Sequence, residues 1–235
     1  MNILLFDASD RIDELRIRVD DDRLKHLVAV HRSAVGDTLR VGEIDGRIGK
    51  ATIEALGPEE AVLRVELQRE PPPKLPIIVL LALPRPKMLR RILRSVAEFG
   101  VSELHLINSA RVEKSFWQSP LLQQESIRNY LLQGLEQAGD TRLPAVHQHK
   151  RFKPWIEDEF PALAAGKSLL LAHPGNHPPC PSTLQADTLL AIGPEGGFVP
   201  YEVEQFEKAG CEIVSLGPRI LRVENAVSAL LGRFI

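Results

Sequence analysis

Five short apolar runs in the second part of the chain restrict its fold more than any other feature. Each run ends within two residues of a proline, glycine or asparagine, as expected for strands that are covered on both faces. The runs are 77–83, 104–107, 169–172, 188–192 and 213–216. Amphipathic helical stretches occur near 87–99, 118–138, 200–209 and 222–234. This alternation predicts an α/β fold around a largely parallel sheet.

The first part of the chain has a different pattern. Residues 38–41, 47–53 and 61–67 alternate apolar with polar side chains, and Asp45-Gly46 between the first two runs is typical of a tight hairpin turn. Short strands of this kind predict a small β-barrel. Prolines at 71–73 cannot continue a strand ladder. We therefore predict two domains, at 1–70 and 74–235.

Composition excludes several classes of protein. The chain has 29 Lys+Arg against 31 Asp+Glu, a net charge of −2, so a wholly basic nucleic-acid binder is excluded although a local basic patch is not. The longest apolar run, 77–83, is too short to span a bilayer, and Met1–Asp7 lacks the basic leader of a signal peptide. We expect a cytoplasmic protein without membrane attachment.

Cysteine and histidine spacing gives no sign of a metal site or a disulfide framework. Cys180 and Cys211 lie far apart, and the simplest interpretation is two buried thiols. His147, His149 and His173 do not pair with acidic or cysteine residues at metal-ligand spacing along the chain. The sequence therefore predicts no metal.

The common nucleotide-binding motifs are absent, although an α/β domain makes them the first to test. Neither a phosphate loop nor Gly-x-Gly-x-x-Gly follows an apolar run, which disfavours P-loop enzymes, NAD-binding domains and Rossmann-type methyltransferases. Instead, the glycine-rich segment 193–197 follows the run at 188–192. It is either a tight strand-to-helix turn or a loop that lets the backbone approach a ligand closely.

Two further segments carry charged residues in suggestive places. At 216–226 a strand end meets a helix start, and Arg222 and Glu224 there either pair with each other or act on a ligand. Segment 85–94 contains five basic residues and no acidic one. At helical spacing these basic side chains share one face, which is either simply solvated or contacts phosphates.

Together these segments resemble the RsmE family of ribosomal RNA uracil-N3 methyltransferases in the SPOUT superfamily. The resemblance covers nearly the whole chain and rests on four motifs in order. These are the Lys-containing helix 87–101, Glu136-Gln137-Ala138-Gly139, the loop Gly193-Pro194-Glu195-Gly196-Gly197, and Leu216-Gly217 with Ile220-Leu221-Arg222-x-Glu224. The chain departs from the family pattern at 1–6, at Asp140 and at Asn225, where an Arg-containing segment, an Arg and a Thr are usual.

The resemblance implies a PUA-like N-terminal barrel, a C-terminal domain with a trefoil knot, and a homodimer. It also implies S-adenosylmethionine as cofactor and small-subunit 16S ribosomal RNA as substrate, methylated at the uridine that the family usually modifies. The implied cofactor-binding residues are Ala172, His173, Pro174, Ile192, Gly193, Pro194, Glu195, Gly196, Gly197, Leu216, Gly217, Ile220, Leu221 and Ala226. This cofactor has no phosphates, which fits the missing phosphate motifs.

Catalytic and RNA-binding residues follow from the same resemblance and from charge. Arg222 is the candidate for stabilising negative charge on the uracil, and Glu195 and Glu224 are candidate bases. The candidate RNA-binding residues are Lys87, Arg90, Arg91, Arg94, Arg111 and Arg32. Two alternatives stay open: an RNA-binding ribosome-assembly factor that has lost catalysis, and a methyltransferase of the same fold that acts on another nucleotide.

Overall fold

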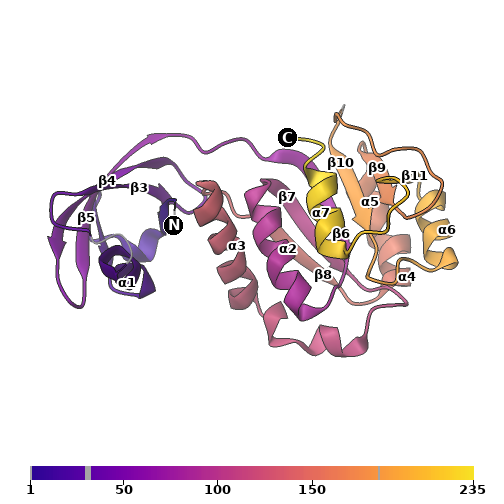
Figure 1. The fold of residues 1–235 in the computed structure, drawn as a ribbon, viewed down its shortest axis with the longest axis horizontal. Coiled ribbons are helices and arrows are strands. Elements are labelled where there is room, and N and C mark those ends of the chain that lie inside the picture. The colour runs from indigo at the N-terminus through magenta and orange to yellow at the C-terminus, as the bar shows by residue number, and fades with distance from the viewer. Residues whose placement is uncertain (1, 30–32, 185) are drawn as a thin grey trace. The chain divides into compact units, whose positions relative to one another are not determined.

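The computed structural model of the chain describes residues 2–29, 33–184 and 186–235. They form two compact units, whose elements are labelled in Figure 1. The N-terminal unit is Met1–Pro73 with Leu132–Leu143, and the C-terminal unit is Lys74–Leu131 with Pro144–Ile235. The sequence predicted a division at 70–74 but did not anticipate that 132–143 belongs with the first unit. No helix among the described residues is long and apolar enough to cross a membrane.

A curled five-stranded sheet forms most of the N-terminal unit (Figure 1). The strand order is β1-β3-β4-β5-β2, with β1 parallel to β3 and the other neighbours antiparallel. The elements in chain order are β1 (Leu4–Phe6), η1 (Ala8–Asp10), β2 (Arg16–Val19), α1 (Asp22–Ala29), β3 (Thr38–Glu43), β4 (Ile48–Leu56) and β5 (Ala61–Arg69). The three alternating runs are β3, β4 and β5, so the predicted small β domain is confirmed.

The predicted hairpin turn also anchors the second segment of this unit. Asp45 has a φ of 59°, a left-handed conformation that Asp tolerates, and Gly46 N donates to Glu43 O at 2.8 Å. Asp45 N in turn donates to Thr141 O at 2.8 Å. The Thr141 hydroxyl donates to Gly46 O at 2.6 Å. Residues 139–143 are thereby held on the hairpin by backbone and side-chain hydrogen bonds.

Asp140, one of the departures from the family pattern, has a structural role in this segment. Its side chain is buried, and Oδ1 accepts hydrogen bonds from Thr141 N at 2.6 Å and from Arg142 N at 3.2 Å. A short side-chain acceptor next to free backbone donors stabilises a turn. Aspartate at 140 therefore stabilises the turn that holds residues 139–143 on the hairpin.

Six parallel strands form the sheet of the C-terminal unit, in the order β11-β9-β10-β6-β7-β8. The strands are β6 (Leu75–Ala82), β7 (Val101–Ile107), β8 (Ala145–His149), β9 (Ser168–Ala172), β10 (Thr188–Ile192) and β11 (Glu212–Val214). The five apolar runs correspond to five of these strands, and the predicted parallel sheet is confirmed. The sequence analysis did not identify β8, an edge strand whose side chains are largely polar.

Helices and short helical turns cover the sheet. In chain order they are α2 (Pro86–Glu98), η2 (Lys114–Gln118), η3 (Pro120–Leu122), α3 (Gln124–Ala138), α4 (Phe152–Pro154), η4 (Trp155–Glu159), α5 (Phe160–Ala164), α6 (Pro200–Lys208) and α7 (Val223–Leu231). The stretch predicted as one helix from 118 begins only at Gln124, because Ser119 and Gln123 have extended backbone conformations on either side of a short 3₁₀ turn. Proline at 120 disfavours a helical conformation at Ser119. Helices α2 and α7 pack side by side (Figure 1).

Burial shifts the pKa of cysteine and histidine side chains in the C-terminal unit. Cys180 and Cys211 are both buried free thiols, as predicted, and burial raises the pKa of Cys211 to about 12. Burial lowers the pKa of His105 on β7 to about 4. Each shift has the same origin, since a low-dielectric interior disfavours the charged form of either group.

Candidate functional site

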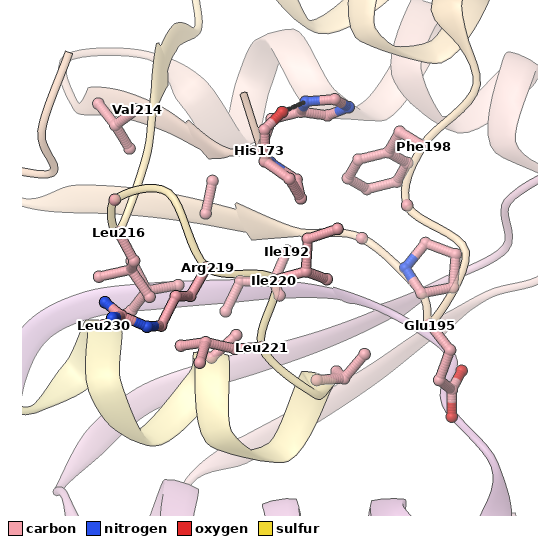
Figure 2. A pocket seen from close by; sticks show the side chains of 18 residues that line it. His173, Ile192, Glu195, Phe198, Val214, Leu216, Arg219, Ile220, Leu221 and Leu230 are labelled. Atoms are coloured by element: carbon pink, nitrogen blue, oxygen red, sulfur yellow. Dashed lines mark hydrogen bonds between the residues drawn. The ribbon is translucent and has the colours of Figure 1, made fainter. Parts of the chain in front are cut away.

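Three loops at one edge of the parallel sheet enclose a pocket (Figure 2). In the strand register Ala172 of β9 lies opposite both Ile192 of β10 and Val214 of β11. The loops that follow these strands therefore begin at the same level, although they are far apart in the sequence. Residues of all three loops and of α7 line the cavity between them.

The lining of the pocket is mostly apolar. Ile192, Leu216 and Leu221 project into it, and Phe198 and Leu230 close it from the sides (Figure 2). The lining residues with polar side chains are His173, Glu195 and Arg219. Arg219 and Glu195 lie at opposite ends of the view in Figure 2, and the carboxylate of Glu195 points away from the apolar side chains. Such a lining suits an uncharged aromatic ring with polar edges.

All of the predicted cofactor-binding residues except Gly196 line this pocket. The sequence analysis missed further lining residues because they carry no motif of their own. These are Phe198, Val214, Arg219, Val223 and Leu230. Val214 lies in a predicted strand, and Val223 and Leu230 lie in a predicted helix, but only the pairing of the strands shows that they meet.

Gly196 has a different function from its neighbours in the loop. Its carbonyl accepts a hydrogen bond from the guanidinium of Arg111, and a Cβ built on Gly196 would lie 2.8 Å from Cδ of that arginine. The residue thus faces the segment after β7 and does not line the pocket, while its role in cofactor binding stays a prediction. The neighbouring Gly197 does line the pocket, with a φ of +71° in a turn closed by Gly197 N and Pro194 O at 2.8 Å.

Glu202 of α6 also connects the segment after β7 with the chain that follows the loop at 193–197. Its side chain is only 3% exposed and accepts hydrogen bonds from Ala110 N at 2.7 Å, Ser109 Oγ at 3.2 Å and Val199 N at 3.0 Å. A buried carboxylate with three donors is well compensated. The sequence analysis missed this anchor. Its only local signal is a glutamate three residues after the start of the α6 cap, where an acidic side chain commonly meets free N–H groups.

The three candidate catalytic residues lie beside the pocket on two of its loops. Arg222 precedes α7, is exposed, and within the described residues forms no side-chain hydrogen bond or ion pair. Glu224 in the first turn of α7 is 12% exposed, with Oε1 3.9 Å from Nη1 of Arg91. Glu195 accepts a hydrogen bond from Arg85 N at 3.3 Å. The sequence predicted these positions but did not predict that both carboxylates face basic residues of 85–94.

The basic side chains of α2 form a face, as the helical spacing predicts. Leu89, Ile92, Leu93, Val96 and Ala97 are buried on the other side. Lys87, Arg90 and Arg91 are exposed, and the guanidinium carbons of Arg90 and Arg94 lie 5.9 and 5.1 Å from the ring centroid of Tyr130. Through Arg91 this face also reaches Glu224, so it flanks the pocket. The remaining candidate for RNA binding, Arg32, lies outside the described residues.

Comparison with known proteins agrees with this architecture. A family model described as an RNA methyltransferase domain matches residues 70–235, and a model of the RNA methyltransferase PUA domain matches residues 19–66. The chain is 32% identical to ribosomal RNA small subunit methyltransferase E of Treponema pallidum, over 97% of this chain and 88% of that protein. It is 26% identical to the protein of the same name from Mycobacterium bovis, over 91% and 84%.

A solved structure has the same fold. It is a ribosomal RNA small subunit methyltransferase E from Neisseria gonorrhoeae bound to S-adenosyl methionine, with a TM-score of 0.78, 18% identity, and coverage of 98% of this chain and 95% of that one. The domain match extends over more than half of the sequence, and the identity to the Treponema protein extends over nearly all of it. The chain therefore belongs to the ribosomal RNA small subunit methyltransferase E family of RNA methyltransferases.

Proposed function

We propose that this protein transfers a methyl group from S-adenosylmethionine to N3 of a uridine in small-subunit ribosomal RNA. The observation that carries the proposal is the apolar pocket at the ends of β9, β10 and β11, with Arg222 at its side and a basic helix face next to it. The family of the chain supports methylation of small-subunit ribosomal RNA, since its relatives are named ribosomal RNA small subunit methyltransferase E.

The lining of the pocket fits the proposed cofactor in polarity. Apolar side chains such as Ile192 and Leu221 would hold the adenine, while backbone groups of the loops satisfy its polar edges. Glycines at 193 and 197 let the backbone approach closely. When bound, the cofactor supplies an activated methyl group on a sulfonium. The same cofactor is present in the Neisseria gonorrhoeae structure, which shares this fold.

Uracil N3 is a weakly acidic imide nitrogen, and it must lose its proton before it can accept a methyl group. The guanidinium of Arg222 would stabilise the negative charge that then develops on the uracil oxygens. Glu195 and Glu224 are the candidate proton acceptors, with Arg85 N 3.3 Å from the carboxylate of Glu195 and Arg91 Nη1 3.9 Å from that of Glu224. Alignment of the nitrogen with the methyl group would supply much of the remaining rate.

The target nitrogen lies on the base-pairing edge of uracil, so the base must be unpaired or flipped when it reacts. The basic face of α2, with Lys87, Arg90, Arg91 and Arg94, would bind the surrounding phosphates. Because Arg91 contacts Glu224, phosphates bound on this face would lie close to the candidate catalytic residues.

Mass spectrometry of small-subunit ribosomal RNA from cells with and without the gene tests the proposed reaction. We expect one N3-methyluridine to disappear in the deletion and to return on complementation. Loss of a methyl group from another nucleotide would support a methyltransferase of different specificity. An unchanged methylation pattern, together with defective subunit assembly, would support the RNA-binding factor without catalysis.

Replacing Gly197 by valine should abolish cofactor binding. A β-branched residue at a φ of +71° is strained by about 1–3 kcal/mol, and at this position the strain falls on a loop that lines the pocket. Gly166→Val is the matched control, because Gly166 has a φ of +72° and lies outside the pocket. Calorimetry with S-adenosylmethionine should show binding to the Gly166 variant and none to the Gly197 variant. Equal affinity in the two would refute the placement of the cofactor.

The basic face of α2 can be tested by salt dependence. If it contacts phosphates, Lys87→Ala with Arg94→Ala should weaken RNA binding and reduce the slope of log affinity against log salt by roughly 0.7–0.9 per lost contact. Cofactor binding should be unchanged. Lys208→Ala, on the exposed side of α6, is the control. A slope equal to that of the wild type would show that this face is solvated and does not contact phosphates.

We also propose that the active form is a homodimer, in which the neighbouring subunit completes the RNA-binding surface. The proposal rests on the family resemblance. Sedimentation at micromolar concentration should detect a dimer, whereas a fully active monomer would contradict it.

A further inference from the structure

A cluster of histidine and glutamate side chains lies away from the cofactor pocket, on the edge strands β7 and β8. Glu103 and His105 alternate along β7, and His147 and His149 alternate along β8. In the parallel register His105 lies opposite His147, and Ile107 lies opposite His149. Residues two apart on a strand share a face. The four side chains are therefore brought together by strand pairing, although 41 residues separate His105 from His147.

Three of these side chains converge at a ligand-like spacing. The distance from Glu103 Oε2 to His105 Nε2 is 3.1 Å, and to His147 Nε2 it is 3.7 Å. All three atoms lie within 4.8 Å of one another. Ligand atoms at about 2.0–2.1 Å around one tetrahedral ion are separated by about 3.3 Å. Both distances to Glu103 Oε2 lie close to that value.

The hydrogen-bond chain through this cluster lacks one proton. The chain consists of three successive contacts. His149 Nδ1 lies 3.3 Å from Glu159 Oε2, His149 Nε2 lies 3.0 Å from His105 Nδ1, and His105 Nε2 lies 3.1 Å from Glu103 Oε2. Two neutral imidazoles supply only two protons to these three contacts. One contact must then bring two lone pairs together, unless a positive charge lies between them.

The position of that charge follows from the exposure of the two ends. Glu159 is 63% exposed and water can separate it from His149, whereas the side chain of His105 is 8% exposed. With Glu159 accepting from His149 Nδ1–H, and His149 Nε2 accepting from His105 Nδ1–H, the lone pair of His105 Nε2 faces Glu103 and His147. A metal-binding histidine usually donates its other ring N–H to an acceptor that fixes its orientation, and here that acceptor is His149 Nε2.

We propose that Glu103, His105 and His147 bind a divalent transition-metal ion, with Zn²⁺ the best fit, and that His149 and Glu159 orient His105. Two imidazoles with one carboxylate favour zinc and its neighbours over Mg²⁺ or Ca²⁺, which prefer oxygen ligands. Three protein ligands leave a fourth position for water. His147 is 47% exposed, which gives the ion a path from solvent.

Such an ion would fasten the edge strand β8 to the sheet. Strand β7 leads directly into the segment that carries Ala110 and Arg111, whose contacts reach Glu202 and Gly196. Asn108 N also donates to His149 O at 2.9 Å, so this segment begins at the cluster. Because a ligand that binds only the folded state stabilises it, bound zinc should raise the melting temperature of the whole protein.

The test is calorimetric titration of the metal-free full-length protein with Zn²⁺. We expect one equivalent to bind, and His147→Ala to weaken binding at least about 100-fold, because it removes a ligand. Glu159→Gln should weaken it roughly 10–100-fold, as loss of an outer partner does. His177→Ala is the control, since His173 and His177 form a second histidine pair, with ring centroids 5.8 Å apart. It should bind zinc as the wild type does.

X-ray absorption of the zinc-loaded protein supplies an independent readout. A shell of nitrogen and oxygen at about 2.0–2.1 Å without sulfur is expected. Glu103→Gln is a second variant that keeps the side-chain shape and removes the charge, so a folding defect of His147→Ala would not prevent the test. Zinc binding that is absent in the wild type, or equally strong in all of these variants, would overturn the proposal and leave a shared proton as the missing charge.

Discussion

Replacing Arg222 by alanine is expected to slow methyl transfer by roughly 10²–10³-fold, the usual effect of removing one group that stabilises charge in a transition state. Arg222 does not line the pocket, so the affinity for S-adenosylmethionine should stay unchanged. Stability should change by less than about 0.5 kcal/mol, because the side chain is exposed and provides no helix cap. Single-turnover methylation of unmodified small-subunit RNA measures the rate, and calorimetry measures cofactor affinity.

Two companion variants make this result specific. Arg219→Ala removes a guanidinium that does line the pocket, and it should lower cofactor affinity more than the rate of the bound complex. Arg222→Lys keeps the charge and should recover part of the rate. If Arg222 stabilises the deprotonated uracil, the alanine variant should need a higher pH than the wild type to reach its maximal rate. A wild-type rate and pH profile in Arg222→Ala would remove this residue from the mechanism.

Replacing Glu202 by leucine should lower the free energy of unfolding by about 3–5 kcal/mol, since each buried donor left without an acceptor costs about 1–3 kcal/mol. The three donors are Ala110 N, Ser109 Oγ and Val199 N. Glu204→Leu on the same helix is the control, because Glu204 is exposed and pairs only with Lys208 at 2.7 Å. It should change stability by about 0–1 kcal/mol.

Urea unfolding followed by circular dichroism measures both variants. The Glu202 variant should also bind S-adenosylmethionine more weakly, because Val199 and Ala110 belong to the segments that hold the loop at 193–197. A change in stability no larger than that of Glu204→Leu would show that water replaces the carboxylate at this point.

The parts of the fold that depend on local pattern could be predicted from the sequence. Strand β10 is buried at all five positions and is apolar throughout apart from Thr188, so its type and position were evident. Strand β8 was not, because it lies at the sheet edge and its Ala-Val-His-Gln-His sequence has no apolar face. Its position is decided by pairing with β7, which is an interaction between distant segments.

The same distinction applies to the site residues. Motif residues such as Ile192 and Leu221 were predicted because they stand in recognisable loops. Glu202 and the cluster around His105 were missed, since their partners are remote in sequence and nothing local marks them. Gly196 was assigned to the pocket by its motif, but its direction depends on the turn at Gly197, which aims it at Arg111 instead. Side-chain direction in a loop follows from backbone torsions that sequence spacing does not specify.

The order of the chain in the two units has a consequence for synthesis on the ribosome. The N-terminal sheet ends at Arg69, yet the segment that binds its hairpin is 132–143 and is made much later. The pocket likewise takes lining from β9 through Leu230 in the last helix. Although domains usually fold one after another as they emerge, neither unit of this chain can be completed early. The pocket is therefore complete only after α7 has left the ribosome.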